Sequence, residues 1–231
     1  MVQLSKRLRM IANMVTRGSC VADIGCDHAH TSIFLIENQI AQKVIAMDVN
    51  KGPLERATEN VARYHVSDRI VIRRSNGLEA LQEGEVDTLL ISGMGGALII
   101  RILEDGKPVV ENIRELILQP QSEIELVRKY LHTIGFSILE ENMLKEDGKF
   151  YVAIHALRGK EQYEKELFYS YGKSLLIQKN KALQEYLNHQ LQKTNQILNA
   201  LKASQNTETK ERMDELGEEI IAIEEALTYY R

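Results

Sequence analysis

The stretch VADIGCDHAHTS, residues 21–32, gathers several side chains that could do chemistry. Strand-like residues precede Gly25, and a thiol, a carboxylate and an imidazole follow at Cys26, Asp27 and His28. Residues of these types could form a metal site, an acid–base or nucleophilic pair, or the rim of a cofactor pocket. The choice among these three largely decides what the protein does.

The spacing of the sulfur and imidazole groups argues against a metal site. Cys26, His28 and His30 alternate over five residues, and the sequence has no second Cys or His cluster to complete a tetrahedral zinc site. We therefore expect no metal. We also expect no nucleophilic role for Cys26, although His28 could in principle activate it. His30 is expected to be a helix-start residue without a chemical role.

A cofactor pocket fits the stretch better. Ligands of open α/β sheets bind beyond the carboxyl ends of the strands, which is where this stretch lies. A dinucleotide site would have the pattern G-x-G-x-x-G, whereas only Gly25 is present, and Asp23 and Asp27 would repel a pyrophosphate. The same carboxylates favour a ligand with positive charge. S-adenosylmethionine carries an ammonium and a sulfonium, so the pattern favours this methyl donor over NAD.

Three further strand ends carry candidate ligand-binding groups. Asp48 ends the second predicted strand and is placed to accept hydrogen bonds from ribose hydroxyls. Asn76 and Gly77 follow the third, where the amide could bind the edge of an adenine or the pair could form an ordinary turn. The glycines of ISGMGG, 91–96, let the backbone pass close to a ligand after the fourth strand, on the side of the transferable methyl group.

Alternating strands and helices position these residues and predict a parallel sheet. The expected strands cover 20–25, 43–49, 69–75, 86–92, 114–120, 136–142 and 149–157, and the expected helices cover 4–16, 29–39, 52–64, 97–105 and 122–134. The last two strands are close enough to form a hairpin at a sheet edge. We therefore predict an open, doubly wound α/β domain over residues 1–159.

The composition changes after residue 160, where Leu, Lys, Gln and Glu dominate. Apolar residues alternate steps of three and four, as in a heptad repeat, at Leu187, Leu191, Leu198 and Leu201 and again at Met213, Leu216, Ile220, Ile223, Leu227 and Tyr230, with Thr194 filling one gap. The polar segment 203–209 predicts a break, with Thr207 or Thr209 capping the second helix. Residues 160–231 are thus expected to form a helical hairpin with a coiled-coil seam.

Composition and charge limit the possible partners. No apolar run approaches the ~18–20 residues that span a bilayer, and the N-terminus lacks the apolar core of a secretory signal. With two cysteines, Cys20 and Cys26, expected as free thiols, we predict a cytoplasmic protein that contacts no membrane. The net charge of −4 argues against a globally basic nucleic-acid binder. Residues 1–22 nevertheless contain no acid and four cations, which could contact phosphate, at Lys6, Arg7, Arg9 and Arg17.

The motifs DIGCDHAH, SNGLEAL, ISGMGGALI, LILQPQ and KEDGKFY occur in this order. With them the chain resembles, over nearly its whole length, the bacterial tRNA (adenine-22) N1-methyltransferases. The resemblance implies a Rossmann-like class I methyltransferase domain, S-adenosylmethionine as methyl donor, tRNA as partner, and a C-terminal coiled-coil domain that helps to hold tRNA. We expect it to act as a monomer.

The resemblance also implies roles for individual residues. The methionine end of the donor would lie against Asp23, Gly25, Asp27 and His28, the ribose against Asp48 and the adenine against Asn76 and Gly77. The methyl-transfer face would be formed by Ser92, Gly93, Met94 and Gly95, with Gln119 and Pro120 beside the target base. Lys6, Arg7 and Arg9 would contact phosphate, and Tyr151 or Phe150 would stack on the base. The family usually has Asp, Ala and Asn where this chain has Asn76, Ser92 and Gln121.

Adenine N1 carries a lone pair and no proton, so methyl transfer to it needs no general base. Catalysis would then consist mainly of positioning N1 in line with the methyl group and sulfur, after the base is exposed at a cost of a few kcal/mol. Two other functions stay open: a methyltransferase for another RNA base, and a non-catalytic module that binds S-adenosylmethionine and a partner. Enzymes that methylate exocyclic amines commonly carry a polar-Pro-Pro-aromatic loop after the fourth strand, and SGMG lacks it.

Overall fold

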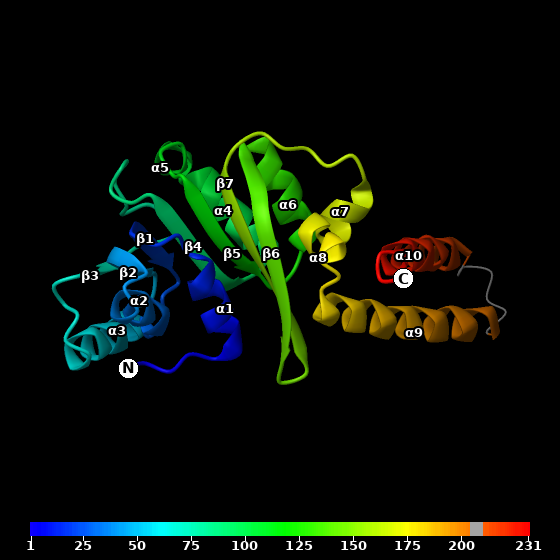
Figure 1. The fold of residues 1–231 in the computed structure, drawn as a ribbon, viewed down its shortest axis with the longest axis horizontal. Helices are drawn as coiled ribbons and strands as arrows, with labels where there is room; N and C mark the ends of the chain where they lie inside the picture. The colour runs from blue at the N-terminus through cyan, green and yellow to red at the C-terminus, as the bar shows by residue number, and fades with distance from the viewer. Residues whose placement is uncertain (204–209) are drawn as a thin grey trace. The chain divides into compact units, whose positions relative to one another are not determined.

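The computed structural model describes residues 1–203 and 210–231 and divides the chain into two compact units (Figure 1). The first unit contains Met1–Asn142 and Tyr151–Gln162. The second contains Met143–Phe150 and Tyr163–Arg231, so the tip of one hairpin belongs with the C-terminal helices.

A seven-stranded sheet with strand order β3-β2-β1-β4-β5-β7-β6 organises the first unit. Its strands are β1 Ser19–Ile24, β2 Ala41–Asp48, β3 Ile70–Arg74, β4 Thr88–Met94, β5 Glu115–Pro120, β6 Phe136–Glu146 and β7 Lys149–Arg158. Strands β1 to β5 pair in parallel, and β7 pairs antiparallel with β5. The central strands are buried along most of their length, as expected for parallel strands covered on both faces. This is the open, doubly wound α/β fold that the sequence predicts.

The helices of the first unit fall into two groups. One contains α1 Lys6–Met14, α2 His30–Glu37 and α3 Lys51–Arg63, and the other contains α4 Gly96–Asp105, α5 Lys107–Val110 and α6 Ile124–Thr133. The chain runs outward from β1 to β3 and then returns to β4 on the other side of β1. Because crossovers are right-handed, this reversal puts the two helix groups on opposite faces. It also makes the carboxyl ends of β1 and β4 the switch point where ligands bind.

The second unit joins the β6–β7 tip to four helices, α7 Glu166–Tyr171, α8 Lys173–Ile177, α9 Lys181–Ala203 and α10 Lys210–Thr228. Asn180 Nδ2 donates to the carbonyl oxygen of Met143 over 3.3 Å, and the Phe150 ring meets Tyr186 edge-on with centroids 5.5 Å apart. Lys145 forms an ion pair with Glu185. These contacts attach the tip to the start of α9.

Helices α9 and α10 pack against each other, and Thr194 Oγ1 donates to Glu219 over 3.2 Å. The residues of the predicted heptad stripe are buried or half-buried, with Leu187, Leu216 and Ile223 almost inaccessible. The coiled-coil seam itself stays a prediction. Most of the predicted break at 203–209, with its caps Thr207 and Thr209, lies outside the described residues.

Candidate functional site

The turn after β1 has an unusual backbone. Gly25, Asp27 and Ala29 all have positive φ, at 73°, 50° and 57°. The N–H groups of Gly25 and Cys26 both donate to the carbonyl oxygen of Met47 in β2, over 2.8 and 2.9 Å. A Cβ on Gly25 would overlap the Cε atom of Met94, the last residue of β4. The turn therefore lies close to both neighbouring strands and requires glycine at its first position.

Asp23 and Asp27 occupy different environments although both flank this turn. Asp23 is buried and accepts a 2.6 Å hydrogen bond from Ser32 Oγ, whereas the Asp27 side chain is 70% exposed. Burial raises the pKa of Asp23 to about 6, and the charge of Asp48 adds to the effect. Asp23 is thus mostly ionised at neutral pH, inside the protein, and only Asp27 faces solvent.

We expect Asp23→Asn to stabilise the ligand-free protein at pH 7.5. A pKa above the unfolded value means that ionisation of Asp23 costs stability as pH rises through about 6, and this cost is absent below the unfolded pKa near 3.8. An asparagine of the same shape avoids it, so a gain on the order of 1–3 kcal/mol is expected at pH 7.5 and a smaller gain at pH 4. Urea unfolding of both proteins at the two pH values measures the difference; an equal gain at both would contradict the assignment.

The two histidines that follow this turn contact each other and Asn60, and the Cys26 thiol is buried. The rings of His28 and His30 stack with centroids 5.7 Å apart, and Asn60 Nδ2 donates to the carbonyl oxygen of His28 over 3.0 Å. Burial, together with His28, lowers the pKa of His30. Burial raises the pKa of the Cys26 thiol, which therefore stays protonated at neutral pH. Within 1–203 and 210–231, no three His, Cys, Asp or Glu residues are grouped to hold a metal ion.

The ends of β2 and β3 present the groups expected to face a nucleoside. Asp48 Oδ1 accepts a 2.8 Å hydrogen bond from the N–H of Asn50, which fixes the carboxylate at the strand end. Asn76 Nδ2 donates to Glu79 Oε1 over 2.8 Å, and Gly77 has a φ of 55°. The Asn76–Glu79 bond and the positive φ of Gly77 are typical of a tight turn at the end of β3.

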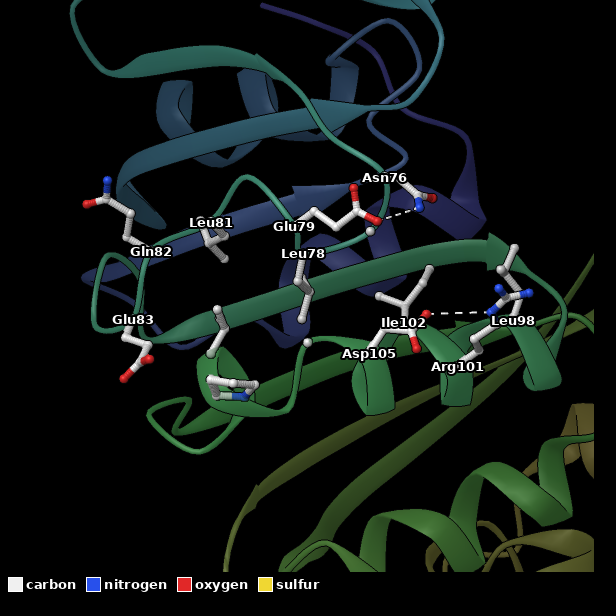
Figure 2. A pocket seen from close by; sticks show the side chains of 14 residues that line it. Asn76, Leu78, Glu79, Leu81, Gln82, Glu83, Leu98, Arg101, Ile102 and Asp105 are labelled. Atoms are coloured by element: carbon white, nitrogen blue, oxygen red, sulfur yellow. Dashed lines mark hydrogen bonds and ion pairs between the residues drawn. The ribbon is translucent and has the colours of Figure 1, made fainter.

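A cavity of about 580 Å³ begins at Asn76 and Gly77 and continues beside α4 (Figure 2). Its α4 wall includes Leu98, Arg101 and Ile102. Leu98 is 49% exposed and gives this wall an apolar surface. Of the residues that line this cavity, the sequence analysis assigned a ligand-binding role only to Asn76 and Gly77.

Hydrogen bonds join the end of β4 to the end of β5. Gln119 is fully buried, and its Oε1 accepts from the N–H of Gly93 over 3.2 Å and from Arg7 Nη1 over 2.8 Å. Ser92 lies opposite Gln119 and Met94 opposite Pro120 in the β4–β5 pair, with an irregularity between them. The residues predicted for the methyl-transfer face are thus contiguous in space.

The segment Gln121–Glu123, which follows β5, also contacts the end of β4 and the start of α4. The sequence analysis did not predict these contacts. The N–H of Gln121 donates to the carbonyl oxygen of Met94 over 2.9 Å, and the N–H of Gly96 donates to that of Ser122 over 3.1 Å. Glu123, with a φ of 51°, accepts the N–H of Ala97 over 3.0 Å at the start of α4. Together with Ser122 Oγ, this bond lowers the pKa of Glu123. No local sequence signal marks a left-handed glutamate.

Residues 4–154 match the methyltransferase domain family. A tRNA (adenine(22)-N(1))-methyltransferase of Bacillus subtilis is 31% identical over 99% of this chain and 98% of its own. The chain belongs to the tRNA (adenine(22)-N(1))-methyltransferase family. The structure of the M. capricolum protein TrmK, solved with S-adenosyl-homocysteine, covers 99% of both chains with a TM-score of 0.87 at 27% identity. That of Sp1610 from Streptococcus pneumoniae, solved with S-adenosyl-L-methionine, covers 97% and 100% with a TM-score of 0.84 at 33% identity.

In this member of the tRNA (adenine(22)-N(1))-methyltransferase family, some of the residues predicted to bind substrate are exposed and others contact side chains of the protein. Lys6 and Arg9 are exposed on α1. Arg7 instead points into the unit, where its guanidinium lies 5.5 Å from the centre of the Tyr151 ring. Phe150 contacts Tyr186 and Lys145 in the second unit. Among the described helices, none is long and apolar enough to cross a membrane.

Proposed function

We propose that this protein transfers the methyl group of S-adenosylmethionine to N1 of an adenine in tRNA, at position 22. The observation that carries the proposal is the shape and charge of the switch point. There the glycine-rich loop after β4 lies against the turn after β1, with Asp23, Asp27 and Asp48 at the adjoining strand ends. The relatives named for this reaction align with the chain over nearly its full length.

The residues at this edge fit a cationic methyl donor. Among the described residues, only hydrogen bonds from Ser32, and no cation, counter the burial that raises the pKa of Asp23. A cationic group of a ligand nearby would lower this pKa and stabilise the carboxylate. Asp48 would hold the ribose, the turn from Gly25 to His28 the methionine end, and Asn76 with Gly77 the adenine. S-adenosylmethionine supplies a methyl group on a sulfonium that leaves as a neutral thioether.

Adenine N1 attacks with its own lone pair, so the N1–C bond forms as the C–S bond breaks and no proton moves. The end of β4 from Ser92 to Gly95 and the end of β5 at Gln119 and Pro120 would then act by orientation and by excluding water. The product base is cationic, and backbone carbonyl oxygens and carboxylates near it would stabilise the developing charge.

Mass spectrometry of nucleosides tests the reaction. Unmodified tRNA incubated with the protein and the donor should accumulate 1-methyladenosine, and a tRNA with A22 replaced by guanosine should not. Formation of another methylated nucleoside would support the alternative of a different RNA base. Binding of the donor without any methyl transfer to tRNA would support a non-catalytic module.

We further propose that residues 1–159, apart from the hairpin tip Met143–Phe150, form the methyltransferase domain, and that residues 160–231 together with this tip form a tRNA-binding arm. The candidate cations of the arm are Lys173, Lys179, Lys181 and Lys193. Lys173 lies over the ring of Tyr163, and Lys179 Nζ donates to the carbonyl oxygen of Arg231. Lys181 and Lys193 are exposed on α9 and have no ion pair with any described residue, which makes them the best placed to contact phosphate.

Reversing the charge at both positions, Lys181→Glu with Lys193→Glu, should raise the Kd for tRNA and leave the Kd for S-adenosylmethionine unchanged. Loss of two phosphate contacts should reduce the slope of log K against log salt concentration by about two. The variant with arginine at both positions keeps the charge and serves as the control. Equal salt slopes for the wild-type and glutamate proteins would contradict a phosphate role for α9.

The proposal keeps the expectations of a cytoplasmic monomer that needs no metal. Light scattering during size exclusion, with and without tRNA, measures the stoichiometry. Methylation in the presence of a chelator should proceed at the unchanged rate.

A further inference from the structure

The guanidinium of Arg7 is engaged within the protein. Its Nη1 donates to Gln119 Oε1 over 2.8 Å, and the group lies over the Tyr151 ring at 5.5 Å. A charged donor forms a stronger hydrogen bond than a neutral one, and the face of an aromatic ring attracts a cation placed over it. These contacts orient Arg7 toward the sheet, whereas Lys6 and Arg9 on the same helix are exposed.

Gln119 in turn has little freedom to move. It is fully buried, its Oε1 accepts from both Arg7 and Gly93, and its Nε2 donates to the carbonyl oxygen of Pro120 over 3.1 Å. Both ends of the amide are therefore used inside the protein. A Gln119 held in this way positions the Gly93 backbone, and its side chain is fully buried, so it does not lie on the surface that a base would approach.

Gly93 is the position where this arrangement meets the methyl-transfer face. It is exposed and has a φ of 77°, and a Cβ placed on it would lie 3.5 Å from Arg7 Nη1 and 3.7 Å from Gln121 Nε2. The end of β4 at Gly93, the end of β5 and the start of β7 meet here, because β4 pairs with β5 in parallel and β7 pairs with β5 antiparallel. Arg7 contacts Gln119 at the end of β5 and Tyr151 at the start of β7, and Gln119 in turn binds the N–H of Gly93.

We propose that Arg7 is a positioning residue for methyl transfer and not a phosphate contact. It holds Gln119, which fixes the N–H of Gly93, and it holds the Tyr151 ring, so that the end of β4 and the surface receiving the target base keep one geometry. This inference rests on the proposed function, because the geometry matters only if a base is methylated at that face.

The proposal predicts which kinetic constant changes. In Arg7→Met, the Gln119 amide loses its charged donor and the Tyr151 ring loses its cation, so the loop at Gly93 can shift. A displacement of about 1 Å at a reacting centre can cost up to about 100-fold in rate. We expect kcat to fall by about 10- to 100-fold, while the Kd for tRNA and its salt slope stay at the wild-type values.

Arg7→Lys separates the two roles. Lysine keeps the charge and can still meet a phosphate, but it lacks the planar group that reaches Gln119 while lying over a ring. A positioning role predicts that Arg7→Lys stays defective in kcat. Arg9→Met on the same helix is the contrast, since loss of an exposed cation should raise the KM for tRNA and reduce the salt slope by about one.

Gln119→Ala reaches the same loop from β5 and guards against a folding defect in the Arg7 variants. If Arg7 acts through Gln119 as well as through Tyr151, the loss of kcat in the double variant Arg7→Met with Gln119→Ala should be smaller than the product of the two single losses, because both changes remove the Arg7–Gln119 interaction. Donor binding by calorimetry and the melting temperature of each variant show that the fold is retained.

Three results would overturn the inference: wild-type kcat in Arg7→Met, recovery of kcat in Arg7→Lys, or a raised Kd with a reduced salt slope in Arg7→Met. Fully additive losses in the double variant would also contradict it. Failure of the proposed function looks different, because the wild-type protein itself would then produce no 1-methyladenosine, and the inference would fall with it.

Discussion

Asp48→Ala is expected to weaken binding of S-adenosylmethionine by about 10- to 100-fold. Asp48 ends β2, and the N–H of Asn50 holds its Oδ1 at 2.8 Å, so the carboxylate is already oriented before a ligand arrives. Hydrogen bonds from ribose hydroxyls to a charged acceptor contribute about 1.5–3 kcal/mol, which corresponds to this loss of affinity. Calorimetric titration with the donor measures it.

Asp68→Ala is the matched control, because Asp68 is an exposed aspartate in the loop before β3, away from the carboxyl edge of the sheet. Its removal changes the net charge by the same amount and should leave donor affinity unchanged. Equal affinities for wild type and Asp48→Ala would place the ribose elsewhere. Tight binding of NAD by the wild-type protein would contradict the electrostatic argument from Asp23 and Asp27.

Gly96→Ala is expected to cost about 1–3 kcal/mol of stability and most of the methyltransferase activity. A Cβ at this position would lie 2.5 Å from the carbonyl oxygen of Ser122 and 2.9 Å from that of Glu123. Both neighbours are backbone atoms, so the added methyl group must push the loop after β5 away from α4. That movement would break the bonds from Gly96 to Ser122 and from Ala97 to Glu123.

Gly52→Ala controls for the substitution itself. Gly52 lies in the first turn of α3, and a Cβ there would meet no described atom within 4 Å. Alanine is favoured over glycine in a helix by roughly 0.5–1 kcal/mol, so this variant should be slightly more stable and fully active. Melting temperatures and initial rates of both variants suffice, and a harmless Gly96→Ala would show that the two loops are not tightly packed.

Strand positions were predictable because each strand carries its own local signal. The run VADIG and the run TLLIS are apolar, short and bounded by turn residues, and both appear in the structure within one or two residues of the predicted ends. The short helices α5, α7 and α8 were not predicted, since segments of four to six residues have too few turns to show a helical period. The polar residues Asp23 and Asp48 could be placed at one edge of the sheet because both come near the carboxyl ends of parallel strands.

Long-range contacts could not be predicted from one sequence. Arg7 and Gln119 are 112 residues apart, and nothing in LSKRL indicates which of its cations faces inward. Burial of Asp23 beneath the turn, and the left-handed Glu123 at the start of α4, depend on how separate loops pack. The resemblance to a family suggested roles for the residues at this edge, but only the structure shows which side chains are already engaged with one another.

The division of the β6–β7 hairpin between the compact units bears on recombination between relatives. Met143–Phe150 precedes the C-terminal helices in the chain by more than ten residues, yet its side chains share a core with α9 through the Phe150–Tyr186 contact. A chimaera with a single crossover near residue 160 would therefore join a tip from one parent to helices from another. Exchanging the arm intact requires the transfer of two separate segments, 143–150 and 163–231. The arm is therefore one compact unit in space that is encoded by two separate stretches of the gene.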